Sequence, residues 1–143
     1  MSYHVLVPVD WSAQSRNALD HVAEHFPDAD VTVLYVVDPR AEHSRTLAYP
    51  GYRSEAEFKS EVEKATHVLE LARERAENAG LDVRTETAHG EPSRAIVRFA
   101  ENNDVDHVVM GSHGRDGVAR FLLGSVAETV ARRSPVPVTL VRK

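Results

Sequence analysis

Residues 106–114 read Asp-His-Val-Val-Met-Gly-Ser-His-Gly, and nine residues separate Gly114 from a second small pair, Gly124-Ser125. The apolar run that starts the stretch predicts a buried strand, and Ser125 begins a predicted helix. Glycines let the backbone approach a ligand closely, and the first N–H groups of a helix lack intrahelical partners and lie at its positive end. A strand, a glycine loop and a helix in this order favour phosphate binding. The chain contains neither a Walker A sequence nor G-x-G-x-x-G.

Strand and helix patterns alternate on both sides of this stretch. Short, valine-rich apolar runs predict strands at residues 3–9, 31–37, 83–89, 106–110 and 136–141. Helical periodicity, with Ser12 as an N-cap, Pro92 in a first turn and Gly80 as a C-terminal cap, predicts helices at about 12–25, 54–78, 92–102 and 125–133. Residues 40–53 show no periodicity and no motif. The stripe expected to face the core of the longest helix is Phe58, Val62, Ala65, Leu69, Ala72, Ala76 and Ala79.

This alternation predicts an α/β fold built on a parallel sheet, with one domain spanning residues 1–143. Right-handed crossovers make the open, doubly wound arrangement, with helices on both faces, the default for these elements. In such sheets ligands bind beyond the carboxyl ends of the strands, at the point where the strand order reverses. Asp10 and Gly111 each end a predicted strand, so we expect both at that edge.

Two segments, Val7-Pro8-Val9-Asp10 and residues 109–114, together resemble the universal stress protein family. The resemblance extends from residue 3 to residue 142. It implies a Rossmann-like sheet of five strands in the order 3-2-1-4-5, with the first and fourth strands adjacent. The spacing G-x2-G-x9-G-S is typical of the family's ATP-binding members. Tyr35 departs from the family pattern, which often has histidine at that position.

The resemblance also implies roles for individual residues. Asp10 would contact the ribose, the backbone of Val36 would hold the adenine edge, and Pro8 and Val9 would form a wall of the base pocket. Backbone amides of the glycines and the Ser125 hydroxyl would hold the phosphates, whose charge nearby basic residues can neutralise. The candidate nucleotide-binding residues are Pro8, Val9, Asp10, Val36, Met110, Gly111, Ser112, His113, Gly114, Arg115, Gly124, Ser125 and Val126.

Structural alternatives exist for both parts of this candidate site. An aspartate at the end of a strand often caps the helix that follows, so Asp10 has this second interpretation. The glycine loop alone is also consistent with a tight surface turn in which Ser125 is a capping residue. The two features lie at neighbouring strand ends in the expected sheet, and this favours the binding site over either alternative.

Residues 21–25 spell His-Val-Ala-Glu-His, which matches the H-x-x-E-H pattern of some zinc hydrolases. At about 100° per residue, His21 and His25 lie on the side of the helix away from Leu19 and Val22, so we expect them to face solvent. A catalytic metal needs a dry, shaped cavity, and no third ligand can be assigned. We therefore predict neither metal-ligating nor catalytic residues.

Composition limits the classes of function. The chain has 143 residues, a formal net charge of −5 and no cysteine, which excludes disulfides and thiol chemistry. The charge argues against nucleic acid as a partner. No apolar run approaches the ~20 residues that span a bilayer, and residues 1–4 lead directly into a strand without a signal-peptide pattern. These features predict a cytoplasmic protein without a membrane or nucleic-acid partner.

The sequence therefore predicts a cytoplasmic stress-response protein that binds ATP, with Mg²⁺ held through the phosphates, and acts as a nucleotide-dependent switch. No base for activating water can be named, so we predict no enzymatic activity. The resemblance implies a homodimer formed through the last strand, residues 136–141, and an apolar edge strand favours such pairing. The alternative is a dimeric protein-interaction module whose pocket is empty or binds AMP. A phosphoacceptor receiver is disfavoured, because strand 3 ends in His89-Gly90 and lacks the required aspartate.

Overall fold

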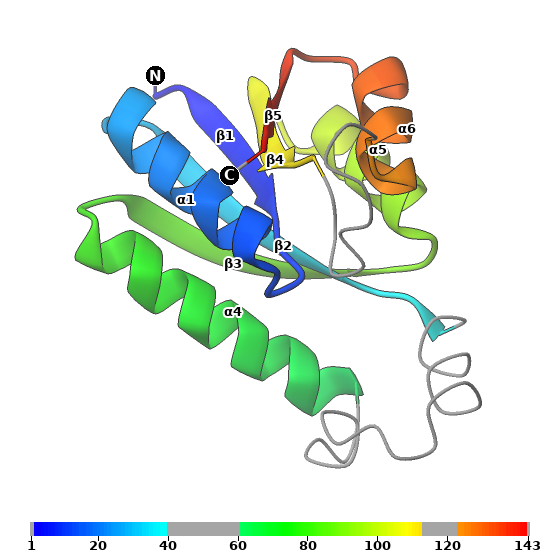
Figure 1. Cartoon of the computed structure of the whole chain (residues 1–143), viewed down its shortest axis with the longest axis horizontal. Coiled ribbons are helices and arrows are strands. Elements are labelled where there is room, and N and C mark those ends of the chain that lie inside the picture. The colour runs from blue at the N-terminus through cyan, green and yellow to red at the C-terminus, as the bar shows by residue number, and fades with distance from the viewer. Residues whose placement is uncertain (1, 40–60, 113–122, 143) are drawn as a thin grey trace.

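The computed structural model describes residues 2–39, 61–112 and 123–142. Its parallel sheet has five strands in the order β3-β2-β1-β4-β5, which confirms the predicted fold class and strand order. The strands are β1 His4–Pro8, β2 Asp30–Val37, β3 Asp82–His89, β4 His107–Gly111 and β5 Val138–Val141. The helices in the described ranges are α1 Ala13–His25, α4 Glu61–Asn78, α5 Pro92–Asn102 and α6 Ser125–Arg133. Helices α1 and α4 cover one face of the sheet, and α5 and α6 lie on the other (Figure 1).

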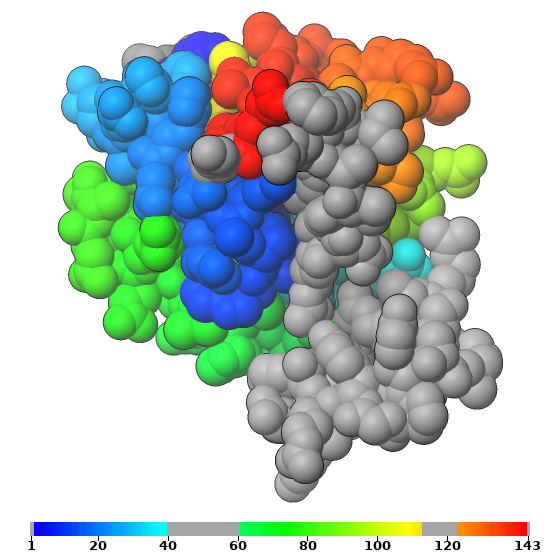
Figure 2. Space-filling model, in the orientation of Figure 1, coloured from blue at the N-terminus to red at the C-terminus, as the bar shows by residue number. Residues whose placement is uncertain are grey.

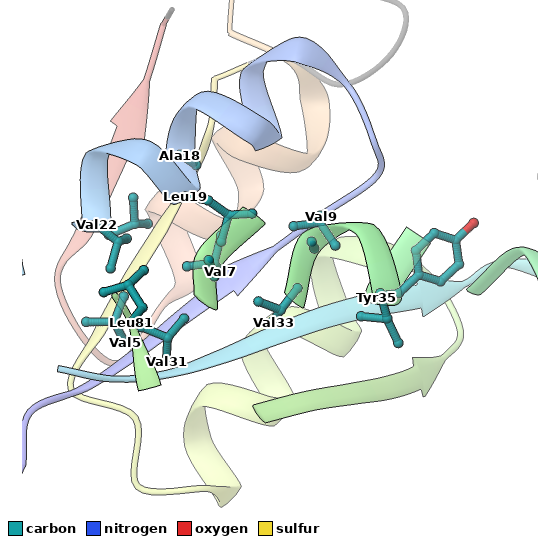
Figure 3. Packing of buried hydrophobic residues seen from close by; sticks show 14 of the residues in the cluster. Val5, Val7, Val9, Ala18, Leu19, Val22, Val31, Val33, Tyr35 and Leu81 are labelled. Atoms are coloured by element: carbon teal, nitrogen blue, oxygen red, sulfur yellow. The ribbon is translucent and has the colours of Figure 1, made fainter. Parts of the chain in front are cut away.

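The central strands are apolar on both faces because helices cover both sides of the sheet. On β1, Val5 and Val7 point into the cluster under α1 and α4, whereas Leu6 points into the cluster under α5 and α6. Figure 3 shows the first cluster, where side chains of α1 meet valines of β1 and β2. Leu6 and Leu34 are fully buried in the second cluster. No helix in the described ranges is long and apolar enough to cross a membrane.

The predicted helix ends are confirmed where the structure describes them. The Ser12 hydroxyl accepts a hydrogen bond from Ser15 N at 3.1 Å and caps α1. Pro92 lies in the first turn of α5, and the carboxylate of Glu91 accepts bonds from the backbone N–H groups of Ser93 and Arg94 at 3.2 and 3.1 Å. Gly80 has φ +88°, the left-handed conformation expected just after a helix.

Two features of the longest helix differ from the prediction. Val62 is 68% exposed although it lies on the predicted core stripe, and Ala79 is exposed beyond the end of α4 at Asn78. In the first turns the helix buries Lys64 and Ala65 instead. Periodicity identifies the apolar side of a helix, but it does not show where along the axis that side meets the sheet. The predicted residues 54–60, including Phe58, lie outside the described ranges.

The last strand is shorter than predicted. It begins at Val138, so Pro137 precedes the strand, and the Pro137 carbonyl accepts a hydrogen bond from Val108 N at 2.9 Å. A proline fits here because it supplies an acceptor to β4 without needing a donor. The strand forms one edge of the sheet and reaches the surface between α1 and α6 (Figure 2, red between blue and orange).

Histidine and aromatic rings gather at the amino edge of the sheet. His107 on β4 forms hydrogen bonds through Nδ1 with the Tyr3 hydroxyl at 3.1 Å and through Nε2 with Thr139 Oγ1 at 2.8 Å. Its ring also lies 5.1 Å from that of Phe26. Burial, and then the charge of His21, lowers the pKa of His107 below 6.5. Burial, followed by the charge of His25, also lowers the pKa of His21.

These shifts predict that acid destabilises the protein before its carboxylates titrate. An unfolded chain binds protons on both histidines as the pH falls through about 6.5, whereas the folded chain resists protonation until lower pH. The free energy of unfolding should therefore decrease from about pH 7 to about pH 5.5, and urea unfolding across this range measures it. The substitution His107→Gln should flatten the pH dependence, whereas His89→Gln, at an exposed site, should leave it unchanged. If the free energy of unfolding depended equally on pH in the wild type and in both variants, the assignment of this effect to His107 would be contradicted.

Candidate functional site

The two central strands part at the carboxyl edge of the sheet. Strands β1 and β4 pair only at Val5–His107 and Leu6–Val108. The last two residues of β1 pair only with β2, and the last three of β4 pair only with β5. After β1 the chain turns to α1 on one face, and after β4 it turns to α6 on the other. This is the reversal of strand order at which open α/β sheets hold ligands.

The structure brings the two halves of the glycine motif together. Gly124 N donates a hydrogen bond to Ser112 O at 2.7 Å, and Ser112 N donates one to Val141 O at 2.9 Å. Ser112 is buried, and its hydroxyl donates to Gln14 Oε1 at 3.4 Å, which connects the end of β4 to the first turn of α1. The first turn of α6 is therefore held beside the end of β4. Three predicted site residues, His113, Gly114 and Arg115, lie outside the described ranges.

The helix after the glycine loop starts differently from the capping alternative. Gly124 is the N-cap of α6, with φ −66° and ψ 153°, and no side-chain hydrogen bond caps the helix. Ser125 is the first helical residue, and its side chain is exposed rather than acting as the cap. Within the described residues, the first N–H groups of α6 therefore have no capping side chain, an arrangement that suits an anion.

The turn between β1 and α1 is held in one conformation by side-chain contacts. Asp10 Oδ1 accepts a hydrogen bond from Ser12 N at 2.9 Å. Trp11 has φ 64°, which is unfavourable for an aromatic residue. Arg16 donates to the Trp11 carbonyl at 3.0 Å, and its guanidinium lies over the indole ring, 5.0 Å from the centroid. This pair holds the strained turn, and the hydrogen bond from Ser12 N orients the Asp10 carboxylate.

The hydrogen bond to Ser12 accounts for only one oxygen of Asp10. Within the described residues, Oδ2 of this half-buried carboxylate takes part in no hydrogen bond. Ser12 rather than Asp10 caps α1, so the helix-capping interpretation of Asp10 is wrong. One acceptor oxygen remains at the edge where β1 and β4 part.

The backbone of Val36 also faces this edge. Leu34 O accepts a hydrogen bond from Val9 N at 2.9 Å, so Leu34 directs its polar groups toward β1. Val37 O accepts one from Gly90 N at 2.9 Å, on the β3 side. Because a strand alternates its sides with a period of two, Val36 directs its N–H and C=O to the β1 side, beyond the last paired residue of β1. These groups can meet the polar edge of a base.

Other predicted site residues have side chains that pack in the core. Val9 is 7% exposed in the cluster beneath α1 and α4, and Met110 is 6% exposed in the opposite cluster. Val126 is half-buried against that second cluster. Pro8 and Gly111 end the two parting strands. These five residues shape the backbone of the site more than they offer polar groups to it.

The H-x-x-E-H sequence lies at the far end of α1, at the amino edge of the sheet. His25 is exposed as predicted, but His21 is half-buried, with its ring 4.3 Å from that of His25 and 6.5 Å from that of Phe26. In the described ranges, no three His, Asp or Glu side chains are grouped to hold a metal ion. The histidines pack against each other and against an aromatic ring.

Sequence reasoning missed three residues of the site: Trp11, Gln14 and Arg16. Arg16 contacts Trp11, and Gln14 contacts Ser112, which lies 98 positions further along the chain. The sequence offers one signal for these residues. They follow Asp10 directly, and residues between a strand and the first turns of the next helix lie at the carboxyl edge of the sheet. The contacts themselves depend on how the strands pair.

Three features define a doubly wound α/β protein of the Rossmann-like class. They are the parallel sheet, its strand order and the hydrogen bond that joins the start of α6 to the end of β4. The chain belongs to the universal stress protein family, whose sequence profile matches residues 1–142. It is 36% identical to universal stress protein MJ0531 of Methanocaldococcus jannaschii, over 97% of this chain and 81% of that protein. Universal stress protein MJ0577 of the same organism is 33% identical, over 97% of this chain and 94% of that protein.

Solved structures agree with this assignment. The structure of MJ0577 matches with a TM-score of 0.77 and 31% identity, covering 99% of this chain and 96% of that one. A universal stress protein in complex with cAMP matches with a TM-score of 0.70 and 27% identity, covering 98% of this chain and 96% of that one.

Proposed function

We propose that this protein binds ATP with Mg²⁺ where β1 and β4 part, and acts in the cytoplasm as a nucleotide-dependent dimeric stress-response switch. The observation that carries the proposal is the hydrogen bond from Gly124 N to Ser112 O, which joins the two halves of the glycine motif at the parting strands. The complex of a related universal stress protein with cAMP supports an adenine nucleotide as the ligand class.

Each part of the nucleotide has a counterpart among the candidate residues. The backbone of Val36 would hydrogen-bond the adenine edge, and Asp10 Oδ2 would accept from a ribose hydroxyl. Because Gly124 N and Ser112 N already donate within the chain, the backbone N–H groups of Gly114 and of the first turn of α6 would hold the phosphates, with His113 and Arg115 adding positive charge. Mg²⁺ would be coordinated by phosphate oxygens and water, as is usual for this cation.

The same arrangement supports binding rather than catalysis. ATP hydrolysis requires a group that orients the attacking water and further positive charge at the transferring phosphoryl group. The carboxylate of Asp10 is assigned to the ribose and is already hydrogen-bonded to Ser12 N. We therefore propose that nucleotide occupancy, not turnover, carries the signal, by ordering the glycine loop and altering partner contacts.

A second candidate is a dimeric protein-interaction module whose pocket is empty or holds AMP. The cAMP complex of a relative also supports this candidate, because its ligand carries a single phosphate. Contacts to the adenine and the ribose would then provide most of the binding, and the glycine motif would bind a single phosphate group.

Calorimetric titration of nucleotide-free protein tests these alternatives. ATP, AMP and cAMP are titrated with and without Mg²⁺, alongside the variant Gly114→Asp. The proposal expects micromolar or tighter ATP binding that Mg²⁺ strengthens and that the folded variant loses, because its carboxylate repels the phosphates. Preference for AMP would favour the second candidate, and absence of wild-type binding to every nucleotide would reject nucleotide binding.

The switch that we propose is a homodimer joined through residues 136–141. Pro137 and Val141 direct their carbonyls toward β4, so Val138 and Leu140 direct their backbone groups outward at the edge of the sheet. An outward row of unpaired groups on an apolar strand is a template for pairing with a second chain.

The dimer predicts an effect of Val138→Pro. This change removes an outward N–H but keeps the hydrogen bonds that Pro137 O and Val141 O accept from β4. Light scattering should give twice the chain mass of 15.9 kDa for the wild type and the single-chain mass for the variant. Val138→Thr, which keeps the N–H and the branched shape, is the control and should remain dimeric. A folded Val138→Pro protein with the dimer mass would assign the interface to another surface.

A further inference from the structure

Residues of α5 and α6 line a groove. These two helices lie on the face of the sheet opposite α1 and α4 (Figure 1). The groove has a volume of about 330 Å³, and it lies apart from the parting strands that form the candidate nucleotide site. Its lining is polar and mostly charged. The lining residues are Glu91, Ser93, Arg94, Val97, Arg98, Glu101, Thr129 and Arg133.

The groove is lined by three arginines and two glutamates, a net charge of +1, although the chain as a whole carries a net charge of −5. Arg94, Arg98 and Arg133 are exposed, and none of them forms an ion pair with another residue in the described ranges. By contrast, Arg132 on the outer side of α6 pairs with Glu128. Three guanidinium groups without a carboxylate partner can each bind a carboxylate through two parallel hydrogen bonds.

The acidic residues of the groove do not neutralise these arginines equally. The Glu91 carboxylate accepts hydrogen bonds from Ser93 N, Ser93 Oγ and Arg94 N, so its charge is engaged with the start of α5. Negative charge is favourable there because the helix presents its unpaired N–H groups. Glu101 remains at the opposite end of the lining. The middle of the groove is therefore positive.

The spacing of the arginines indicates the shape of the ligand. Arg94 and Arg98 lie one turn apart on α5, a separation of about 6 Å between the starts of their side chains. Alternate side chains of an extended peptide are spaced about 6.6 Å apart on one side. The groove follows α5 from Glu91 to Glu101, about 15 Å along the helix axis, which suits four to five extended residues.

We propose that this groove is a docking site for an acidic segment of a partner protein, bound in extended form with carboxylates on alternate residues. Arg94 and Arg98 would each hold one of these carboxylates, and Arg133 would contact the segment from α6. The site is separate from the one proposed for nucleotide, so the protein could bind a partner and a nucleotide together.

Fluorescence anisotropy tests the proposal with a labelled peptide of alternating glutamate and alanine. We expect saturable binding to the whole protein at low salt, weakening as salt rises, and no binding of the matching glutamine–alanine peptide. The double variant Arg94→Glu/Arg98→Glu should weaken binding at least about tenfold. The double variant Arg75→Glu/Arg132→Glu makes the same change of −4 in net charge at exposed arginines outside the groove and should weaken binding by less than about twofold.

Several results would overturn the proposal. One is the absence of saturable binding of the glutamate peptide, and another is equal binding of the glutamate and glutamine peptides. A third is an equal loss of peptide affinity in the groove and control variants, which would indicate attraction to net charge alone. A further arm uses Gly114→Asp, which removes the proposed nucleotide site. If ATP displaces the peptide from that folded variant, the groove binds phosphates rather than an acidic segment. Failure of ATP binding to the wild type with peptide binding intact would reject the nucleotide proposal and leave the docking site standing.

Discussion

Replacing Gly124 by aspartate is expected to weaken ATP binding about 100-fold or more without destabilising the fold. A carboxylate at about 5 Å from a phosphate charge contributes roughly 3 kcal/mol of repulsion at an effective dielectric constant of 20. The folded protein should tolerate the side chain, because Gly124 has φ −66° and ψ 153°, an extended conformation open to any L-residue. Calorimetric titration with ATP measures the loss of affinity.

Stability and affinity should change in opposite directions in this variant. Gly124 is the N-cap of α6, and it has no side-chain capping bond. Aspartate is among the best N-cap residues, so Gly124→Asp should leave the free energy of unfolding unchanged or raise it by a few tenths of a kcal/mol. A loss of ATP binding in a protein of equal or greater stability cannot be attributed to unfolding.

The neutral variant Gly124→Asn separates charge from size. Asparagine caps helices about as well as aspartate and has nearly the same shape, but it carries no charge. Its ATP affinity should remain much closer to that of the wild type. Equal affinity of the aspartate and asparagine variants would show that phosphates do not lie near the start of α6, and would contradict the proposed orientation of the nucleotide.

The largest expected effect on stability is that of Leu34→Ala, with a loss of about 2–5 kcal/mol in the free energy of unfolding. Leu34 is fully buried on β2, within the cluster that α5 and α6 cover. Removing its side chain gives up buried apolar surface and leaves a cavity that close-packed neighbours fill only in part. Urea unfolding followed by circular dichroism measures the change. A domain stabilised by about 5–15 kcal/mol would lose a large fraction of its stability.

Val62→Ala is the matched control for this experiment, and it also tests the corrected burial of α4. The side chain of Val62 is 68% exposed, so its removal should change the free energy of unfolding by less than about 0.5 kcal/mol. Alanine also has the higher helix propensity, which opposes any small loss. A loss near that of Leu34→Ala would mean that Val62 is buried and that the sequence-based stripe is right.

Much of the fold was predictable from local patterns. The apolar runs and the helical stripes identified the strands and helices in the described ranges to within two or three residues. Ser12, Pro92 and Gly80 marked helix ends correctly because capping depends on residues that are adjacent in the chain. The strand order came from the family resemblance, since periodicity contains no information about which strands pair.

The errors share one physical cause, which is that burial depends on neighbours far away in the sequence. Val62 has the right periodicity but lies in the first turn of α4, where Lys64 and Ala65 are buried instead. His21 was expected in solvent, yet it is half-buried and close to His107, which lies 86 positions further along the chain and whose pKa the charge of His21 lowers.

The sequence by itself determined the class of fold and the location of the glycine motif, because both depend on residue types at short spacing. Only the tertiary structure decided that β1 and β4 part after Leu6 and Val108, and that Gly124 reaches Ser112. It also decided that Arg16 contacts Trp11 at the turn after β1 and that α5 and α6 line a groove with three arginines. Such contacts join residues distant in the chain, and they form only when a whole sheet and its helices bury their apolar faces together.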